Sequence, residues 1–302
     1  MFLVPLRAEL SPATSFHETC ENLAKKWPDE ARKRANKIFQ NRADTLAMTN
    51  RISQQFRNYP DLTFSDVKML HKTCAHSLAI SYEYAPFCEL FTDRELELMN
   101  LQDDIDDYHS DAYGADPIVY KSACTVIKEA VNFIDTANSN TNTYKSNAFR
   151  KVALRFSHAG AMKPLIALLD LFKDNRQTFD VESMSPSTRR LWRSSEVSPF
   201  AANVIFVALV KNNPQGSQYG FRTEITDRDI QIVTLVQERA HRIDHCRGDS
   251  EFMCSLSNFK LRFAEQLHKC DLNRMCSQSG SSKQSYHLLQ TLLAFVTLYI
   301  FL

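Results

Sequence analysis

Hydrophobic and polar positions in the first half of the chain follow the period of an α-helix. The stretch from Pro28 to Asn58 is charged and helix-like, and Phe64 to Ile80 continues with apolar residues at helical spacing. Thr92 is placed to cap the next helix, because acidic residues follow it in the first turn. Ile118 to Ile134 repeats the helical spacing after Pro117. The pattern therefore predicts a mostly helical first half.

The pattern changes after the polar tract from Asn138 to Asn147, which is typical of a linker. Strand signals follow at Lys151 to Ser157, Ala202 to Val210 and Phe221 to Ile225, and Pro164 to Phe172 is typical of an amphipathic helix. This order predicts an α/β fold, in which 152–157 is a buried strand of a sheet with parallel pairing at its centre.

His158 lies where the predicted strand at 152–157 gives way to the helix that follows. In open α/β sheets the carboxyl ends of strands and the following helix N-termini bind polar ligands, and free N–H groups there favour phosphate. A single histidine on an apolar run is more often a core or loop residue than a ligand-binding one. The local pattern alone therefore leaves both interpretations open.

Four segments of the chain, in order, resemble the histidine acid phosphatases, specifically the multiple inositol polyphosphate phosphatase branch. VALRFSHAGAMKPLIALL resembles the family's second catalytic motif, apolar-x-Phe-x-His-Ala-Glu-Thr followed by an apolar helix, and His158 and Ala159 match it. The other three segments are APFCELFT, YHSDAYGADP and WRSSEVSPFAANVIF. Together they cover roughly residues 15–276.

The resemblance implies a fold and a division of the chain. Residues 1–145 would form the mostly helical cap subdomain, and 146–276 the C-terminal part of the α/β histidine phosphatase core. That core would be partial, with an incomplete mixed sheet and flanking helices. Residues 277–302 would be a polar spacer and a hydrophobic tail.

The resemblance also implies a phosphate site, which is incomplete in this sequence. The family's nucleophilic histidine belongs to an Arg-His-Gly-x-Arg-x-Pro motif that the chain lacks. Gly160 stands where the family has the carboxylate that protonates the leaving group, and glycine cannot donate a proton. His158 would keep the role of the phosphate-contacting catalytic histidine. Lys163 is a weaker substrate-binding candidate, since a solvated helix charge is the commoner role for such a lysine.

We therefore expect a fragment of a phosphomonoesterase that acts on inositol hexakisphosphate, lower inositol phosphates and bisphosphoglycerate, inactive as the chain is given. The resemblance implies no cofactor and no metal. Two alternatives remain open: a non-catalytic, surface-anchored paralogue that binds phosphorylated ligands or a protein, and a decayed gene product.

Eight cysteines, an even number, are typical of a protein that forms disulfides in an oxidising compartment. The family resemblance implies one disulfide between Cys74 and Cys88 and another between Cys246 and Cys254. The partners of the other four stay open. A zinc site from His71, Cys74, His76 and Cys88 is a rival hypothesis, although their spacing fits no common zinc motif.

The last residues, 288–302, form an apolar run behind a polar spacer, which is the layout of a glycolipid-anchor signal. Ser279 or Gly280 would carry the anchor, and the protein would reside at the cell surface after passing through the secretory pathway. The apolar stretch after Met1 is too short for a signal peptide. We therefore expect a segment that precedes Met1, which would also hold the nucleophile motif.

Charge adds little to these expectations. The 302 residues carry a net charge of +1, so no global charge favours nucleic acid. The acidic run from Asp103 to Asp107 is predicted to be a solvated helix face, and Arg193 to be structural.

Overall fold

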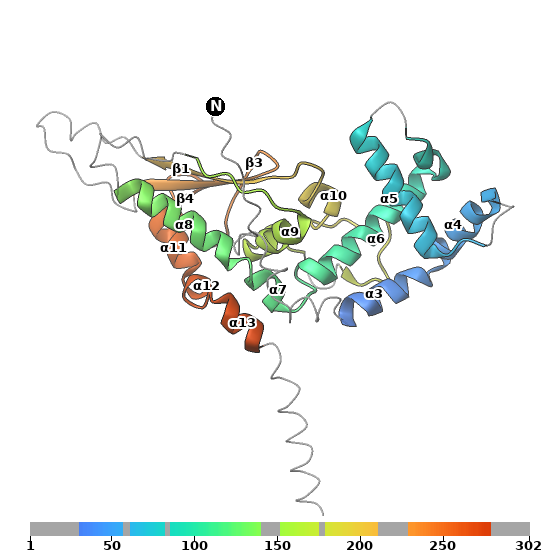
Figure 1. Cartoon of the computed structure of the whole chain (residues 1–302), viewed down its shortest axis with the longest axis horizontal. Helices are drawn as coiled ribbons and strands as arrows, with labels where there is room; N and C mark the ends of the chain where they lie inside the picture. The colour runs from blue at the N-terminus through green and yellow to red at the C-terminus, as the bar shows by residue number, and fades with distance from the viewer. Residues whose placement is uncertain are drawn as a thin grey trace, which may run out of the picture.

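The computed structural model describes residues 30–56, 61–81, 85–139, 152–174, 179–210 and 229–278. Helices dominate the first half, and a small sheet with further helices follows (Figure 1). The mixture of helices and sheet confirms the α/β fold class. The predicted boundary between the subdomains at residue 145 lies outside the described residues and stays a prediction.

The charged N-terminal stretch forms two helices, where one continuous helical stretch was predicted. α3 (Glu30–Gln40) and α4 (Ala43–Ser53) are separated at Arg42, whose backbone is extended, and η1 (Gln54–Phe56) follows α4. The Asn41 side chain donates a hydrogen bond to the Lys37 carbonyl at 2.7 Å, which caps the end of α3. A local side-chain bond of this kind is not visible in the hydrophobic period.

The next two long helices begin where the sequence predicts. α5 (Phe64–Ile80) starts after Thr63 and α6 (Asp93–Asp111) after Thr92, and both threonines form capping boxes. The short η2 (Pro86–Leu90) connects the two helices. α6 packs against both α3 and α5 and contributes the fully buried Ile105 to the core. It is therefore the central helix of this half.

The stretch predicted as one helix from Ile118 to Ile134 is divided into α7 (Pro117–Lys121) and α8 (Cys124–Ser139). At the break, the buried Ser122 hydroxyl donates to the Val119 carbonyl at 2.5 Å. Serine side chains that bond to nearby carbonyls compete with the helical backbone, which accounts for the interruption.

The sheet is antiparallel in all of its described pairs. β1 (Val204–Val210) pairs with β2 (Ile230–Val236), and β2 also pairs with β3 (Arg239–His241) and β4 (Met253–Ser255). β1 agrees with the predicted strand, whereas the strand predicted at 221–225 lies outside the described residues. The expected parallel pairing is not among the described strands.

Up to residue 278, where the described part of the chain ends, three helices follow the sheet, and the first of them covers one of its faces. Phe206 of β1 meets Phe259 of α11 with ring centroids 5.9 Å apart. The helices are α11 (Leu256–Arg262), α12 (Ala264–His268) and α13 (Leu272–Gln278). α12 also packs against α8, so the C-terminal helices join the sheet to the first half (Figure 1).

The prediction of a buried strand at 152–157 is wrong. The segment carries no strand pairing to any described residue, and Val152, Leu154 and Phe156 are 68%, 69% and 76% exposed. Alternation of apolar side chains favours an extended backbone, but burial requires elements that pack against it. No described element covers this segment.

The helix after His158 is longer at its start than predicted. α9 (Ala159–Leu168) begins at Ala159, and Pro164 lies inside it. It ends before Phe172 because Asp170 and Phe172 take left-handed backbone conformations, with φ of 57° and 56°. α10 (Ser194–Val197) is a single turn that packs against α6.

Both expected disulfides are present, and the described residues contain a third. Cys74 of α5 is joined to Cys88 of η2, and Cys246 to Cys254. The sequence left open the third, which joins Cys124 of α8 to Cys270 across 146 positions. Ser279, Gly280 and the apolar tail lie outside the described residues, and no helix within the described ranges is long and apolar enough to cross a membrane.

Candidate functional site

His158 is the N-cap residue of α9, at the junction where the sequence predicted a phosphate-contacting group. Its Nδ1 accepts a hydrogen bond from the Gly160 N–H at 3.2 Å. Because Nδ1 is the acceptor, a neutral imidazole in this position carries its proton on Nε2. The ring is exposed, so Nε2 is a donor placed at the start of a helix, which favours anions.

Gly160 and Ala161 form the first turn of α9, where the resembling motif has a carboxylate and a hydroxyl. The Gly160 N–H is held by His158 Nδ1, and the Ala161 N–H by the His158 carbonyl at 3.0 Å. Neither side chain can donate a proton. Both N–H groups are bonded within the turn, and the turn lacks the acid that would protonate the leaving group of a phosphate ester.

Most of the acidic run on α6 is buried, with Asp103 partly exposed, so the prediction of a solvated face is wrong. The Asp104 side chain is 2% exposed and forms an ion pair with Arg190, and it accepts a hydrogen bond from the Ser194 N–H at 2.5 Å. Burial raises the pKa of Asp104, and Arg190 opposes that rise. A carboxylate this deeply buried needs such a partner.

Asp106 is held by a second set of cationic and amide donors. Arg32 binds it at 2.6 and 2.9 Å through two nitrogens, Asn36 donates at 2.6 Å, and Lys68 Nζ lies at 3.4 Å. Burial by itself would raise the pKa of Asp106, but these donors outweigh it and hold the pKa well below its usual range.

Lys163 is neither a solvated helix charge nor a bare cation at the phosphate site. Its side chain is 12% exposed, and Nζ lies 2.6 Å from Asp107 and 3.7 Å from Asp111. Burial would lower its pKa, but Asp107 and Asp111 outweigh that effect and raise it. Burial also raises the pKa of Asp111 to about 6, against the opposing charge of Lys163. Lys163 therefore joins α9 to α6.

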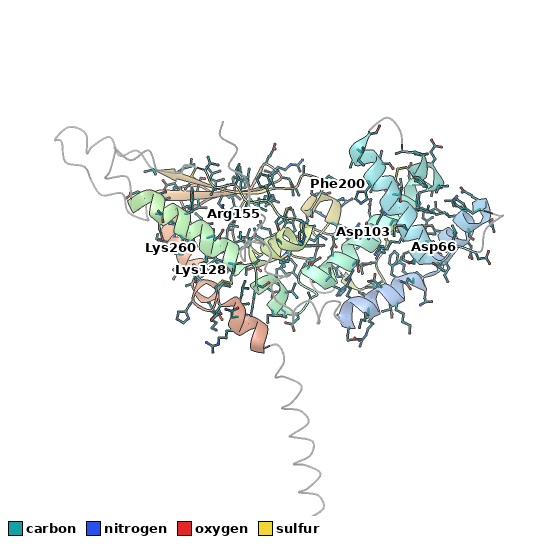
Figure 2. All side chains as sticks on the ribbon, viewed as in Figure 1. Asp66, Asp103, Lys128, Arg155, Phe200 and Lys260 are labelled. Atoms are coloured by element: carbon teal, nitrogen blue, oxygen red, sulfur yellow. A yellow bond between two sulfur atoms is a disulfide. The ribbon has the colours of Figure 1, made fainter. Side chains whose placement is uncertain are left out.

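Asp103 lies beside a buried histidine. The His71 Nδ1 is 3.8 Å from an Asp103 oxygen, and burial, with Lys68 and Lys72 nearby, lowers the pKa of His71 to about 4. Burial raises the pKa of Asp103 to about 6, with Lys68 opposing. The Asp103 side chain is 36% exposed, so solvent moderates the effect of burial. Figure 2 shows Asp103 on α6, where this helix passes between α5 and α10.

The rival zinc ligands and Arg193 are not part of the site at the start of α9. The disulfide between Cys74 and Cys88 removes both thiolates that the rival zinc hypothesis needs. Arg193 is half-exposed and lies 3.3 Å from Glu196, within its own helical turn.

The row of carboxylates was the feature that the sequence reasoning missed. Asp103, Asp107 and Asp111 are spaced four residues apart, which places them along one face of α6. Aspartates are mostly exposed in proteins, so the spacing alone favoured a solvated face. The signal that distinguishes a buried face from a solvated one is the presence of Lys163 and Arg190 on other elements, and their contacts with α6 are tertiary.

The chain is similar in sequence to known phosphatases. Multiple inositol polyphosphate phosphatase 1 from Gallus gallus is 23% identical over 210 residues, which are 70% of this chain and 43% of that protein. The Homo sapiens protein of the same name is also 23% identical, over 76% of this chain and 44% of its own length. This chain thus spans less than half the length of either relative.

A solved structure shows the same fold. The crystal structure of the phytase from D. castellii matches with a TM-score of 0.50 and 16% identity, over 82% of this chain and 52% of the phytase. The family model of the histidine phosphatase superfamily (branch 2) matches residues 7–223, which is most of the chain. The chain therefore belongs to branch 2 of the histidine phosphatase superfamily.

Proposed function

We propose that this chain carries the phosphate-binding part of a phosphomonoesterase site for inositol polyphosphates. The observation that carries the proposal is His158 as the N-cap of α9, with an exposed ring whose Nδ1 accepts from the Gly160 N–H, so that a neutral imidazole carries its proton on Nε2. A phosphate oxygen at this position would meet a ring N–H and the positive end of a helix.

The substrate class is supported by the names of the relatives, which are inositol polyphosphate phosphatases and a phytase. Myo-inositol hexakisphosphate and lower inositol phosphates are therefore the ligands to test first. Several phosphates on one ring would also suit a surface with more than one cationic group, because each phosphate can engage a separate donor.

Gly160 supports a second candidate function, in which the chain binds phosphate esters without hydrolysing them. The first turn of α9 supplies no acid side chain, and general acid catalysis typically contributes about 10²- to 10⁴-fold in rate. The sequence also lacks the family's Arg-His-Gly-x-Arg-x-Pro motif. Both observations favour binding over turnover for the chain as it stands.

The test is calorimetric titration of the chain with myo-inositol hexakisphosphate, in wild type and in His158→Ser. Serine is a good N-cap residue, so this variant keeps the start of α9 and removes only the imidazole. We expect its affinity to fall about tenfold or more, since one charge-assisted hydrogen bond contributes about 1.5–3 kcal/mol. His268→Ser, at the end of α12, is the control and should bind like wild type.

Two outcomes would contradict the proposal: no binding by the wild-type protein, or equal affinity in wild type and His158→Ser. Release of inorganic phosphate, measured in the same samples, separates the two candidate functions. Turnover that disappears in His158→Ser favours the phosphomonoesterase, and binding without turnover favours the non-catalytic protein.

A further inference from the structure

Helices α6 and α9 run in the same direction, and this direction determines which residues of α6 lie beside the start of α9. Lys163 contacts Asp107 at 2.6 Å, and farther along both segments the Tyr113 hydroxyl donates to the Leu171 carbonyl at 2.6 Å. Contacts that advance together along both segments require a parallel alignment. Figure 1 shows α9 beside α6 in this arrangement, and the two helices pack together.

The alignment places Asp103 at the level of the first turn of α9. Asp103 precedes Asp107 by four residues, and Ala159 precedes Lys163 by four, so each lies about 6 Å back along its own helix. The negative charge of Asp103 also contributes to raising the pKa of Lys163, which agrees with this closeness. Asp103 and the His158 cap therefore occupy the same end of the helix pair.

Asp103 differs from the other carboxylates on this part of α6. Asp104, Asp106, Asp107 and Asp111 each have an arginine or lysine nitrogen within 4.0 Å. Among the residues that the structure describes, Asp103 has only the His71 ring at 3.8 Å, which is beyond hydrogen-bond distance. It is the one carboxyl of this row that no cation holds.

His71 supplies the second, independent observation. The residue is only 7% exposed, and its Nδ1 has no hydrogen-bond partner within the described part of the chain. Buried polar atoms are satisfied in the large majority of cases, so such an atom beside a carboxyl without a cation indicates a site that a ligand completes. The start of α10 lies on the same side, because the Ser194 hydroxyl donates to the Asp103 carbonyl at 3.2 Å.

We infer that Asp103 is a further ligand-contacting residue of the site at the start of α9, where its carboxyl donates a hydrogen bond to an oxygen of the bound phosphate ester. The inference rests on the proposed function. It assigns to the helical half of the molecule a polar contact that the recognised His158 motif does not include.

The protonation of Asp103 then controls binding. Burial raises the pKa of Asp103 to about 6, so the carboxyl is neutral and a donor below that pH and an anion above it. An ionised Asp103 repels phosphate. His71 stays neutral above about pH 4 and supplies no compensating charge. The other charged groups that act on Asp103 are Lys68 and Lys72 of α5, Asp106 and Asp107 of α6, and Lys163 of α9.

The test compares affinities for inositol hexakisphosphate at about pH 5 and about pH 7.5 in wild type and in Asp103→Asn. Asparagine keeps the size and a donor but cannot ionise. Because the ligand itself titrates in this range, the quantity compared is the ratio of variant to wild-type affinity at each pH. We expect a ratio near one at the lower pH and about threefold to tenfold in favour of Asp103→Asn at the higher pH.

Glu97→Gln is the matched control, because it makes the same carboxylate-to-amide change at an exposed position of α6. Asp103→Ser, which also keeps a donor, serves as a second variant if Asp103→Asn folds poorly. For Glu97→Gln we expect a ratio of variant to wild-type affinity that does not change with pH. The same result for Asp103→Asn would overturn the inference. The proposed function would still stand if binding continued to depend on His158. Loss of binding in the wild type at both pH values would overturn the proposed function and this inference with it.

Discussion

The acidic face of α6 and the apolar segment 152–157 are opposites in both composition and burial. The α6 face carries carboxylates and is covered, with the Asp104 side chain 2% exposed. Segment 152–157 carries Val152, Leu154 and Phe156 and is open, with these residues 68–76% exposed. The chemistry of a segment thus determines which groups it can pair with, whereas its burial depends on which other elements pack against it.

Each buried aspartate on α6 forms an ion pair with a cation from elsewhere in the chain, whereas the partly exposed Asp103 has no such cation among the described residues. Arg32 comes from α3, Lys68 from α5, Lys163 from α9 and Arg190 from the loop before α10. A buried ion pair is costly to form and more costly to break, because removal of one partner leaves an uncompensated charge. Loss of any one of these cations is therefore expected to destabilise the folded protein.

The largest effect should come from removing one cation of this set. In Arg190→Ala, Asp104 would lose the partner that opposes the effect of its burial. We expect the free energy of unfolding in urea to fall by about 3–5 kcal/mol at neutral pH. Arg193→Ala is the control, since its ion pair with Glu196 is half-exposed and should contribute less than about 1 kcal/mol. If both substitutions lowered the free energy of unfolding equally, burial would not be what makes the Arg190 ion pair important.

A smaller effect, which depends on pH, is expected at Asp111. The pKa of this carboxyl is about 6 in the folded protein, above its ordinary value of 3.8, so the folded state binds the proton more readily than the unfolded state. Its contribution to stability is complete below about pH 4 and is lost as the pH rises through about 6.

Asp111→Asn should therefore be destabilised most, relative to wild type, near pH 4, with the difference shrinking by up to about 3 kcal/mol toward pH 7. The comparison must be between variant and wild type, because His71 has a lowered pKa and acts with the opposite sign in the same window. Urea unfolding of both proteins across this range measures the difference. A difference that grows with rising pH would show that the carboxyl is ionised in the folded state at pH 4.

The smallest effect on stability should come from the open segment. Phe156→Ser removes a side chain that is 76% exposed, and substitutions at such positions usually change the free energy of unfolding by less than about 0.5 kcal/mol. Ile105→Ala, at a fully buried position of α6, should cost about 2–5 kcal/mol in the same assay. A large loss in Phe156→Ser would mean that the segment is covered in solution.

The sequence predicts those features of the molecule that depend on residues close together in the chain. The caps at Thr63 and Thr92 and the junction at His158 are local, and the structure has helices that start at all three. The breaks at Arg42 and Ser122 depend on single hydrogen bonds, so helical spacing did not reveal them.

Burial was the property that the sequence predicted least well, because it is set by distant elements. Lys163 and the acidic run were expected in solvent, but Lys163 is enclosed against α6, and the acidic run is paired with cations from several other elements. The family resemblance correctly implied the fold and two disulfides, but the Cys124–Cys270 disulfide joins positions 146 apart and no short motif indicates it.

A crystal structure of the chain with bound myo-inositol hexakisphosphate would show whether His158 contacts the ligand. We expect a phosphate oxygen within hydrogen-bond distance of His158 Nε2 at the start of α9, with Asp103 beside it at acidic pH. A ligand bound only on the basic outer face of α3, at Lys33 and Lys37, would contradict the proposed site, as would crystals in which the start of α9 stays empty at saturating ligand.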